Sequence, residues 1–380
     1  MRGSDAELDE LRARDLYREI SQVLETAQGA RVVVGGREML NFSSNDYLGL
    51  AASDRLKLAF VDAVERYGVG SGASRLVCGT QRPHAELEES LAAFLGKERA
   101  LAFANGFAAA GGVLGSVLRK GDVVILDKLC HASLVDGARA SGATVRVFPH
   151  GNLDKLEKHL AWAGGQVGDS GRVLVVTEAV FSMDGDRAQL VEIAALKSRH
   201  GAMLLVDEAH AFGVLGPGGR GLAHESGVAD EVDLLMGTLG KAAGVAGGFV
   251  AARSGLIELI LNRGRSLIYS TAPPAAQAAA ACEGVRLLGS ELGDDLRRRL
   301  WENVHRFDRS APSAIVPWVI GDEAAAMQAA EELQEAGYLI PAIRFPTVAR
   351  GAARLRITFS AAHEAGEIDA LRSRLAPPDR

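Results

Sequence analysis

From about residue 84 onward, short aliphatic runs alternate with longer segments whose apolar residues have helical spacing. Continuous aliphatic runs are typical of strands that are buried on both faces of a sheet. The intervening helical segments lie at 84–95, 107–118, 133–140, 153–162 and 190–200. We therefore expect an α/β fold with a mostly parallel seven-stranded sheet. Its strands are predicted at 100–103, 123–126, 144–148, 173–178, 203–210, 233–238 and 247–252.

The two ends of the chain depart from this alternation. Residues 6–27 carry leucines at helical spacing and predict an amphipathic helix, and RVVVGGREMLNF places Gly35-Gly36 between two apolar runs, which indicates a hairpin. Beyond residue 275 the pattern predicts helices at 275–289, 291–309 and 324–337, strands at 314–320, 338–343 and 354–359, and a terminal helix. We expect three units: an N-terminal helix and hairpin segment at 1–50, a large domain at 51–275 and a small α+β domain at 276–380.

Composition narrows the class of protein. The chain has 380 residues, 48% of them hydrophobic, which is enough for large cores without disulfides or a structural metal. A formal net charge of −6 argues against a nucleic-acid partner, since such proteins concentrate Lys and Arg on one face. Cys78, Cys130 and Cys282 are far apart and form no metal motif, which favours a reducing compartment. The charged N-terminus and the lack of a long apolar run predict a cytoplasmic protein without a membrane span.

Two polar clusters at predicted strand ends suggest a cofactor. Asp207 and His210 follow a buried strand, and Lys241 lies among small residues, three positions after Thr238. A desolvated lysine loses proton affinity and can form a Schiff base, while a carboxylate can keep a pyridinium nitrogen protonated, so the combination suits pyridoxal phosphate. The alternatives are that Asp207 caps a helix, that His210 packs in the core and that Lys241 is an ordinary solvated lysine.

Other predicted strands are also followed by polar residues. Asn105-Gly106-Phe107 lies where a strand turns into a helix, and helix N-terminal amides bind anions, although any such turn favours Gly. His131 follows the run VVILD, where a lone histidine is more often structural than functional. The run at 173–178 ends in Glu178 and is followed by Ser182 and Asp184. The Gly/Ser-rich loops at 41–50 and 68–80 could be ordinary turns.

Taken together, these motifs resemble those of the α-oxoamine synthases, which are pyridoxal-phosphate enzymes of fold type I. The resemblance rests on TEAVFSMDGD, LLVDEAHAFGVLGPGGRG, TLGKAAGVAGG, NFSSNDYLGL and GSGASRLVCGT, which follow the family's order between about residues 15 and 365. It implies a transferase with pyridoxal 5'-phosphate as cofactor, no metal, and a homodimeric assembly.

The resemblance also implies a role for each matching position. Lys241 would carry the cofactor's aldehyde as a Schiff base, Asp207 would pair with the pyridine nitrogen and His131 would stack on the ring. Further cofactor contacts would come from Gly106, Phe107, Ser182, His210 and Thr238, and from the partner subunit's Ser270 or Thr271. The substrate side would be formed by Arg18, Asn45, His131, Thr347 and Arg356.

The chain departs from the family pattern at three positions. Leu239 stands where an aromatic residue is common, Asn105 where Ser is common, and Phe345 interrupts a usual Pro-Pro-Thr. The first two lie beside the expected cofactor site and should not abolish it. The third lies near the expected acyl-substrate contact and bears on selectivity for the acyl chain.

Within the family, AIRFPTV (342–348) and RLRITFSAAH (354–363) are most similar to members that condense L-alanine with a pimeloyl thioester for biotin biosynthesis. The carrier would be coenzyme A or acyl-carrier protein, and CO₂ would be released. Arg354 and Arg356 lie on the same side of a predicted strand. We expect Arg356 to bind the alanine carboxylate, Arg354 to face solvent and Arg18 to meet the distal carboxylate of the pimeloyl group.

Three alternatives stay open. The chain could be another α-oxoamine synthase, of the glycine C-acetyltransferase, 5-aminolevulinate synthase or serine palmitoyltransferase type. It could be an aminotransferase of the same fold, which would share the lysine and the aspartate but not the thioester site. It could also be a non-catalytic relative, although the joint presence of Lys241, Asp207 and His131 weighs against that.

Overall fold

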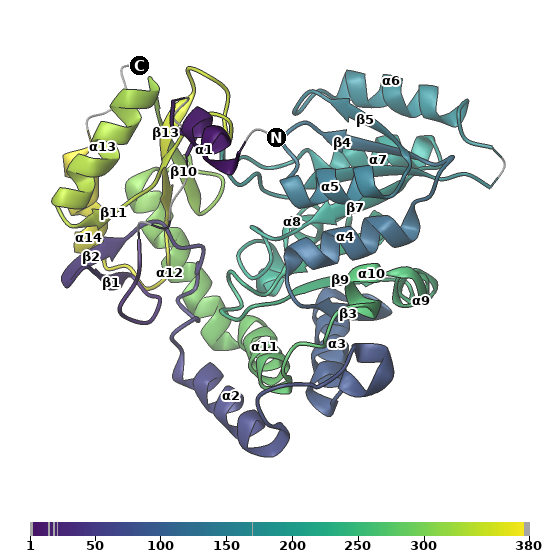
Figure 1. Cartoon of the computed structure of the whole chain (residues 1–380), viewed down its shortest axis with the longest axis horizontal. Coiled ribbons are helices and arrows are strands. Elements are labelled where there is room, and N and C mark those ends of the chain that lie inside the picture. The colour runs from purple at the N-terminus through teal and green to yellow at the C-terminus, as the bar shows by residue number, and fades with distance from the viewer. Residues whose placement is uncertain (1–2, 14–15, 18–19, 21, 169, 376–380) are drawn as a thin grey trace.

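The computed structural model describes residues 3–13, 16–17, 20, 22–168 and 170–375. Its largest feature is a seven-stranded sheet in the order β3-β9-β8-β7-β6-β4-β5 (Figure 1). β9 runs antiparallel to β3 and β8, and the other neighbours are parallel, which confirms the expected mostly parallel sheet. The strands are β3 (Arg99–Phe103), β4 (Val123–Asp127), β5 (Thr144–Phe148), β6 (Val173–Glu178), β7 (Met203–Asp207), β8 (Leu234–Thr238) and β9 (Gly248–Ala252).

Helices bury both faces of this sheet, which explains the continuous aliphatic runs. Leu174 and Val176 of β6 point into one core and Val173 and Val175 into the other, because successive side chains of a strand face opposite ways. The first core is completed by α4 (Gly106–Val117), α5 (Ala132–Ala140) and α9 (Ser254–Arg263). The second is completed by α3 (Arg82–Leu95), α6 (Leu153–Gly164) and α7 (Leu190–Arg199).

Segments from both ends of the chain form two smaller sheets beside the large one (Figure 1). β1 (Arg31–Val34) and β2 (Arg37–Asn41) form the expected hairpin, and Gly35 and Gly36 both have positive φ, as its two-residue turn requires. β2 also pairs in parallel with β11 (Tyr338–Leu339). The other sheet has the order β10-β13-β12, from β10 (Ile315–Gly321), β13 (Ala353–Thr358) and β12 (Ala342–Ile343).

The remaining main helices connect and cover these sheets. They are α1 (Ser4–Ala13), α2 (Asp54–Tyr67), α11 (Ala275–Leu288), α12 (Glu291–Phe307), α13 (Glu323–Glu335) and α14 (Ala365–Arg374), with short helices α8 (Leu222–Glu225) and α10 (Arg265–Ile268). α2 packs mainly against α11. In the part of the chain that the structure describes, no helix has the length and hydrophobicity needed to cross a membrane.

Two predicted elements are wrong. The helix expected over 6–27 is shorter, since α1 ends at Ala13 and Leu24 forms an isolated β-bridge with Val34. No residue of α1 is buried, so its leucine stripe has no core to pack on in this chain. The single strand expected at 338–343 is divided between two sheets around Pro341, which has no N–H to continue a ladder. Arg18 lies outside the described residues.

Candidate active site

A cavity of about 180 Å³ lies at the carboxyl ends of β6, β7 and β8, where ligands bind in open α/β sheets. Seven of the expected site residues line it: Gly106, Phe107, His131, Asp207, His210, Thr238 and Lys241. Ser133, Glu178, Ala209 and Gly237 complete the lining. Residues that are more than 130 positions apart in the sequence are thus brought together by the parallel strands.

One wall of the cavity is the N-terminus of α4, where the backbone comes very close to β9. A Cβ atom on Gly248 would lie 2.3 Å from the Asn105 carbonyl oxygen, so only glycine permits this approach. The Asn105 side chain accepts the Ala108 N–H at 2.8 Å and caps the helix. The first-turn amides of Gly106 and Phe107 have no partner within the helix, and Thr238 lies across from Gly106 on the same cavity. This wall is therefore suited to an anion.

Lys241 is held at the cavity by a buried histidine. Its Nζ lies 2.6 Å from His210 Nε2, and His210 Nδ1 lies 2.5 Å from the Tyr47 hydroxyl. Burial keeps the pKa of His210 well below its usual range, so the imidazole is neutral, and burial also lowers the pKa of Lys241 to about 8. A neutral imidazole has one donor and one acceptor nitrogen, so its tautomer follows the protonation of the lysine. His210 is therefore more than a histidine packed in the core, because it also forms a hydrogen bond with Lys241.

Two buried carboxyl groups end neighbouring strands at this cavity. Glu178 and Asp207 are register partners in β6 and β7 and are 3% and 6% exposed. Burial raises the pKa of both; for Glu178, with the nearby Asp207 charge, it reaches about 8. Asp207 Oδ1 accepts the Ala209 N–H at 2.9 Å, so Asp207 does cap the following turn, as the alternative expected. In the described chain no cation lies within 4.0 Å of Asp207, which leaves its charge available to a ligand.

His131 is not a core histidine. It is exposed, caps the N-terminus of α5, and its Nδ1 lies 2.8 Å from Ser133 Oγ. Its backbone N–H donates to Glu178 Oε1 at 2.5 Å, so the strand-end carboxyl group fixes the residue at the cavity wall. The imidazole ring is therefore held on one side and free to contact a ligand on the other.

The described residues fit pyridoxal phosphate. A lysine amine with a lowered pKa, a buried carboxylate without a counter-ion and a helix N-terminus with free amides all line the same small cavity. These are the groups that an aldehyde, a pyridinium nitrogen and a phosphate require. Within the described ranges, no group of three or more His, Cys, Asp or Glu side chains is arranged to hold a metal ion.

Arg356 reaches toward this cavity from the small β10-β13-β12 sheet. It is 5% exposed, and its guanidinium donates to the Ser182 carbonyl at 2.5 Å and to Asn45 Oδ1 at 3.0 Å. A third bond, at 3.0 Å, goes to Thr358 Oγ1. All three acceptors are neutral, and no carboxylate of the described chain lies within ion-pair distance. Burial is the main cause of the low pKa of His210, the Lys241 charge is the second and the Arg356 charge is the third. The Arg356 guanidinium is therefore close enough to the cavity to affect the groups that line it.

The expectation that Arg354 faces solvent is wrong. Arg354 is 7% exposed, and its Nη1 donates to Asp184 Oδ1 at 2.6 Å and to the Met183 carbonyl at 3.3 Å. Both arginines do lie on the same side of β13, as the alternation predicted. That side faces the turn after β6 rather than solvent, so Arg354 is neutralised within the chain while Arg356 is not.

Several expected site residues do not line the cavity. Ser182 contributes its backbone carbonyl to Arg356. Thr347 lies in the loop after β12, beside a separate cavity with Leu16 and Phe345. Ser270 and Thr271 lie on a loop whose Thr271 bridges to Ser74. Their assigned roles stay predictions, as does that of Arg18, which the described residues do not include.

Tyr47 and Glu178 are among the residues of the site for which the sequence predicted no role. Tyr47 is fully buried and bonds His210, but its only signal in the sequence is its place in the loop NFSSNDYLGL. Glu178 was noted as a strand-end carboxylate without a role, although its position one strand away from Asp207 could have suggested a pair. The Tyr47–His210 bond and the Glu178–Asp207 pair both join residues far apart in the sequence, so both depend on the tertiary fold.

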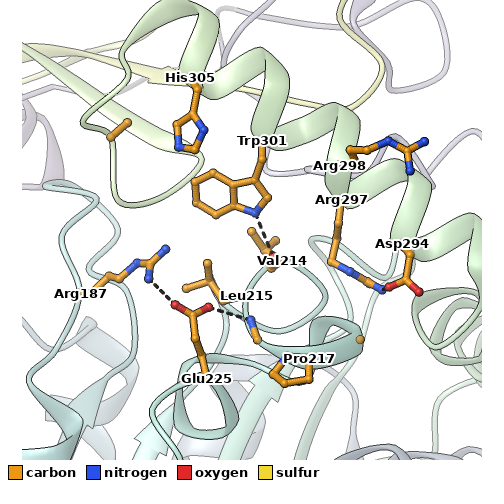
Figure 2. A pocket seen from close by; sticks show the side chains of 13 residues that line it. Arg187, Val214, Leu215, Pro217, Glu225, Asp294, Arg297, Arg298, Trp301 and His305 are labelled. Carbon is orange, nitrogen blue, oxygen red and sulfur yellow. Dashed lines mark hydrogen bonds and ion pairs between the residues drawn. The ribbon is translucent and has the colours of Figure 1, made fainter.

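A larger cavity of about 570 Å³ lies between α12 and the loop at 214–218, with none of the expected site residues (Figure 2). The Arg187 guanidinium lies 2.6 Å from Glu225 Oε1, and Trp301 Nε1 donates to the Val214 carbonyl at 3.4 Å. Arg297 pairs with Asp294, and Arg298 lies 2.9 Å from Asp295. The charges around this larger cavity are thus already balanced by the chain itself.

Comparison with known proteins defines the class. The family model for class I and II aminotransferases matches residues 37–375, and the chain belongs to this family of pyridoxal-phosphate enzymes. The 8-amino-7-oxononanoate synthase of Geobacter sulfurreducens is 47% identical over 373 residues, which cover 96% of this chain and 94% of that protein. The enzyme of the same name from Alcanivorax borkumensis is 46% identical, over 96% and 95% of the two chains.

Solved structures confirm the expected fold type. A lysine-to-alanine variant of a serine palmitoyltransferase from S. paucimobilis, with a bound PLP–myriocin aldimine, superposes with a TM-score of 0.90 at 30% identity, covering 98% of this chain and 95% of that one. An 8-amino-7-oxononanoate synthase from Francisella tularensis gives a TM-score of 0.74 at 28% identity, over 87% and 95% of the chains. The resemblance inferred from the sequence motifs is thus confirmed, and the chain is a pyridoxal-phosphate-dependent enzyme of fold type I.

Proposed function

We propose that this chain is an 8-amino-7-oxononanoate synthase, which condenses L-alanine with a pimeloyl thioester and releases CO₂ and the free thiol carrier. The observation that carries the proposal is its 47% identity, over nearly the full length, to a relative of that name. The site supports it, because the lysine and carboxyl groups that line the cavity, together with the buried Arg356 beside it, suit an amino acid bound next to pyridoxal phosphate.

The cofactor would be held by groups at the ends of the large sheet. Gly106, Phe107 and Thr238 would bind the phosphate, Asp207 would hold the proton of the pyridine nitrogen, and His131 would cover the ring. When bound, pyridoxal phosphate supplies an electron sink for the α-carbon of the amino acid. The low-dielectric surroundings of Asp207 make its charge effective at short range.

Lys241 would move the proton at the substrate α-carbon. With a pKa of about 8, about one tenth of the amine is neutral at pH 7 and about half at pH 8, and the neutral form is the one that acts as a general base. When the amine takes up a proton, it can donate to His210 Nε2, and the opposite nitrogen of the ring then donates to the Tyr47 hydroxyl oxygen. The chain of hydrogen bonds from Lys241 through His210 to Tyr47 can therefore stabilise both the neutral and the protonated amine without moving a heavy atom.

Arg356 would bind the α-carboxylate of alanine. A buried guanidinium without a counter-ion is costly, so an incoming carboxylate restores the balance of charge. The planar guanidinium of Arg356 can form two parallel hydrogen bonds to a carboxylate. Asn45 and the Ser182 carbonyl hold the guanidinium in place before the substrate arrives. Arg18 stays our candidate for the distal carboxylate of the pimeloyl group.

A second candidate is serine palmitoyltransferase activity, which the TM-score of 0.90 to such enzymes favours. Overall shape separates family members poorly, because they share one fold. Sequence identity, at 47% against 30%, favours the first proposal. The test is a panel of L-alanine, glycine and L-serine against pimeloyl, acetyl, succinyl and palmitoyl thioesters, each on coenzyme A and on acyl-carrier protein, with thiol release measured. Preference for serine with palmitoyl thioester would replace the first proposal by the second.

We also propose that the enzyme is a cytoplasmic homodimer. Exposed apolar side chains lie in the segment after α2, which includes the short π-helix Arg75–Gly79, and in the segment that bridges to it, at Val69, Leu76, Val77 and Tyr269, which are 52% to 80% exposed. Apolar groups with such exposure are typical of a surface that a partner covers. The partner subunit's Ser270 or Thr271 would then reach the phosphate. The three free cysteines are consistent with a reducing compartment.

A further inference from the structure

The turn between β6 and α7, residues 181–187, touches both arginines of β13. Its Ser182 carbonyl accepts from Arg356 and its Asp184 carboxylate from Arg354. The turn is closed by the Phe181 N–H bond to the Asp186 carbonyl at 3.0 Å and by the Gly185 N–H bond to the Phe181 carbonyl at 2.8 Å. The orientation of the Arg356 guanidinium therefore depends on where this turn lies.

A histidine that follows β5, the edge strand two places from β6 in the large sheet, holds the end of this turn. His150 follows β5, and its Nε2 lies 2.6 Å from Asp186 Oδ2, while its Nδ1 lies 3.0 Å from Asp127 Oδ1. Asp127 ends β4 and is 4% exposed. The imidazole ring also packs edge-on against Phe181, with centroids 4.3 Å apart. We call Asp127, His150 and Asp186 the carboxylate–histidine clamp.

The clamp needs both ring nitrogens to donate, which only the protonated imidazole can do. Hydrogen bonds to Asp127 first and to Asp186 second raise the pKa of His150 to about 10, so the ring is cationic at neutral pH. The charged groups that face the ring are these two carboxylates: Asp127 at the end of β4 and Asp186 in the turn. The second oxygen of Asp186, Oδ1, is buried without a hydrogen-bond partner, so the link to His150 is the polar contact that holds this side chain.

The turn has little freedom on its other side. A Cβ atom on Gly185 would lie 2.2 Å from the Ile315 carbonyl oxygen, and Gly185 has a φ of +69°, so the turn is seated directly on β10 of the small sheet. The clamp anchors the same turn to β4 of the large sheet. Because the turn is packed tightly on both sides, a displacement of Asp186 should also displace the Ser182 carbonyl, four residues earlier.

We propose that the carboxylate–histidine clamp is a positioning device for substrate binding: it fixes the 181–187 turn and thereby orients Arg356 for the α-carboxylate of the amino acid. The inference rests on the proposed function of Arg356. His150, Asp127 and Asp186 do not line the cavity and are positioning residues. Their loss is expected to weaken binding of the amino acid while leaving Lys241 and Asp207 in place.

The test compares Asp186→Ala with Asp186→Asn in the PLP-loaded protein. The amino-acid dissociation constant is read from the visible absorption without any thioester, for alanine, glycine and serine in parallel. Asp186→Ala should raise it about tenfold, the lower end of what loss of a charge-assisted hydrogen bond costs. Asp186→Asn keeps an oxygen that accepts the Nε2 proton and should restore most of the affinity. The control is His159→Gln, which changes a half-buried histidine outside the clamp whose Nε2 lies 3.3 Å from the Val147 carbonyl oxygen.

A second variant and a second measurement distinguish a loss of positioning from a loss of folding. His150→Gln can donate to only one of the two carboxylates and should raise the dissociation constant as Asp186→Ala does. In both variants, kcat at saturating amino acid should stay within about twofold, because the general base is untouched. Imidazole NMR of the cofactor-free wild type should show His150 doubly protonated at pH 8.

The outcomes separate this inference from the proposed function. If the wild type binds glycine or serine better than alanine, the proposed substrate is wrong. The clamp can still be tested, because Asp186→Ala and Asp186→Asn can be compared with the preferred amino acid, which carries the same α-carboxylate. Unchanged affinity in Asp186→Ala, or equal losses in the Ala and Asn variants, would overturn the clamp as a positioning device. A fall in kcat without a change in affinity would also overturn it. If no amino acid alters the wild-type spectrum, both proposals fail.

Discussion

Two cavities of the described chain, one beside α12 and one at the strand ends, differ in their charges as well as in their size. The larger, beside α12, has a volume of about 570 Å³, and its ion pairs are complete. The smaller, at the strand ends, has a volume of about 180 Å³, yet Lys241 and Asp207 there have shifted pKa values. Arg356 beside it has no counter-ion in the described chain. Buried charge that the fold leaves unbalanced, rather than volume, indicates where a ligand binds.

The largest expected effect is at Lys241. Lys241→Ala should lower kcat by about 10⁴-fold or more, since it removes both the nucleophile for the cofactor and the general base. The variant should still bind pyridoxal phosphate, but borohydride should no longer fix the cofactor to the chain. Thiol release and mass spectrometry after borohydride measure both effects. Near-normal turnover would refute the assignment of the site.

Asp207→Ala should have the next largest effect, a loss of about 10²–10³-fold in kcat together with weaker cofactor retention, because a preorganised charge in a buried site is removed. Dialysis followed by absorption spectroscopy measures retention. Asp294→Ala, at the larger cavity, is the matched control and should keep its cofactor. If Asp207→Ala retains both cofactor and rate, Asp207 is only the cap of the following turn.

Arg356→Lys should raise the alanine KM by about 10- to 100-fold, because a point charge cannot replace a bidentate fork. The KM for the thioester should change far less, which separates the carboxylate site from the acyl site. Steady-state kinetics with each substrate varied in turn provide the measurement. Equal changes in both KM values would place Arg356 elsewhere in the mechanism.

Cofactor loading should depend on pH through Lys241. Its pKa of about 8 in the cofactor-free protein lies below the ordinary value because the charged form is buried. The amine therefore gains a proton, and loses nucleophilicity, as the pH falls through 8. The initial rate of pyridoxal phosphate incorporation should rise about tenfold between pH 7 and pH 9. A rate that is flat across this range would show that the amine is not the group that titrates.

The smallest effect is expected at the larger cavity. Glu225→Gln breaks the ion pair with Arg187 but leaves the strand-end cavity untouched. A partly exposed pair contributes little, so kcat/KM should change by less than about twofold. Loss of activity comparable with that of Arg356→Lys would mean that the larger cavity has a chemical role after all.

The aliphatic runs predicted the large sheet well because its strands, apart from the edge strand β5, are buried on both faces, and such burial requires a continuous run of apolar residues. The strand-end rule then brought Lys241, Asp207 and His131 to one edge. The failures have physical causes as well. Leucine spacing extended the N-terminal helix past Ala13, because amphipathic spacing does not say whether a core exists to receive it.

Long-range polar contacts were beyond the sequence. The alternation of β13 showed that Arg354 and Arg356 share a side, but only the structure shows that Asp184 neutralises one of them and that Ser182 and Asn45 leave the other charged. The bond from Tyr47 to His210 joins residues 163 positions apart. Such pairs are set by sheet order and packing, which no local pattern encodes.

The parallel pairing of β2 with β11 has a consequence for synthesis of the chain. The hairpin leaves the ribosome early, but its partner strand follows about 300 residues later. At the usual rates of translation the hairpin waits about 15–60 s for it. Phe42, which stacks on His363 at 4.1 Å, lacks its cover during that time. We expect the large sheet to form first, and proteolysis of stalled nascent chains should find residues 31–50 cleavable until residues 338–363 have emerged.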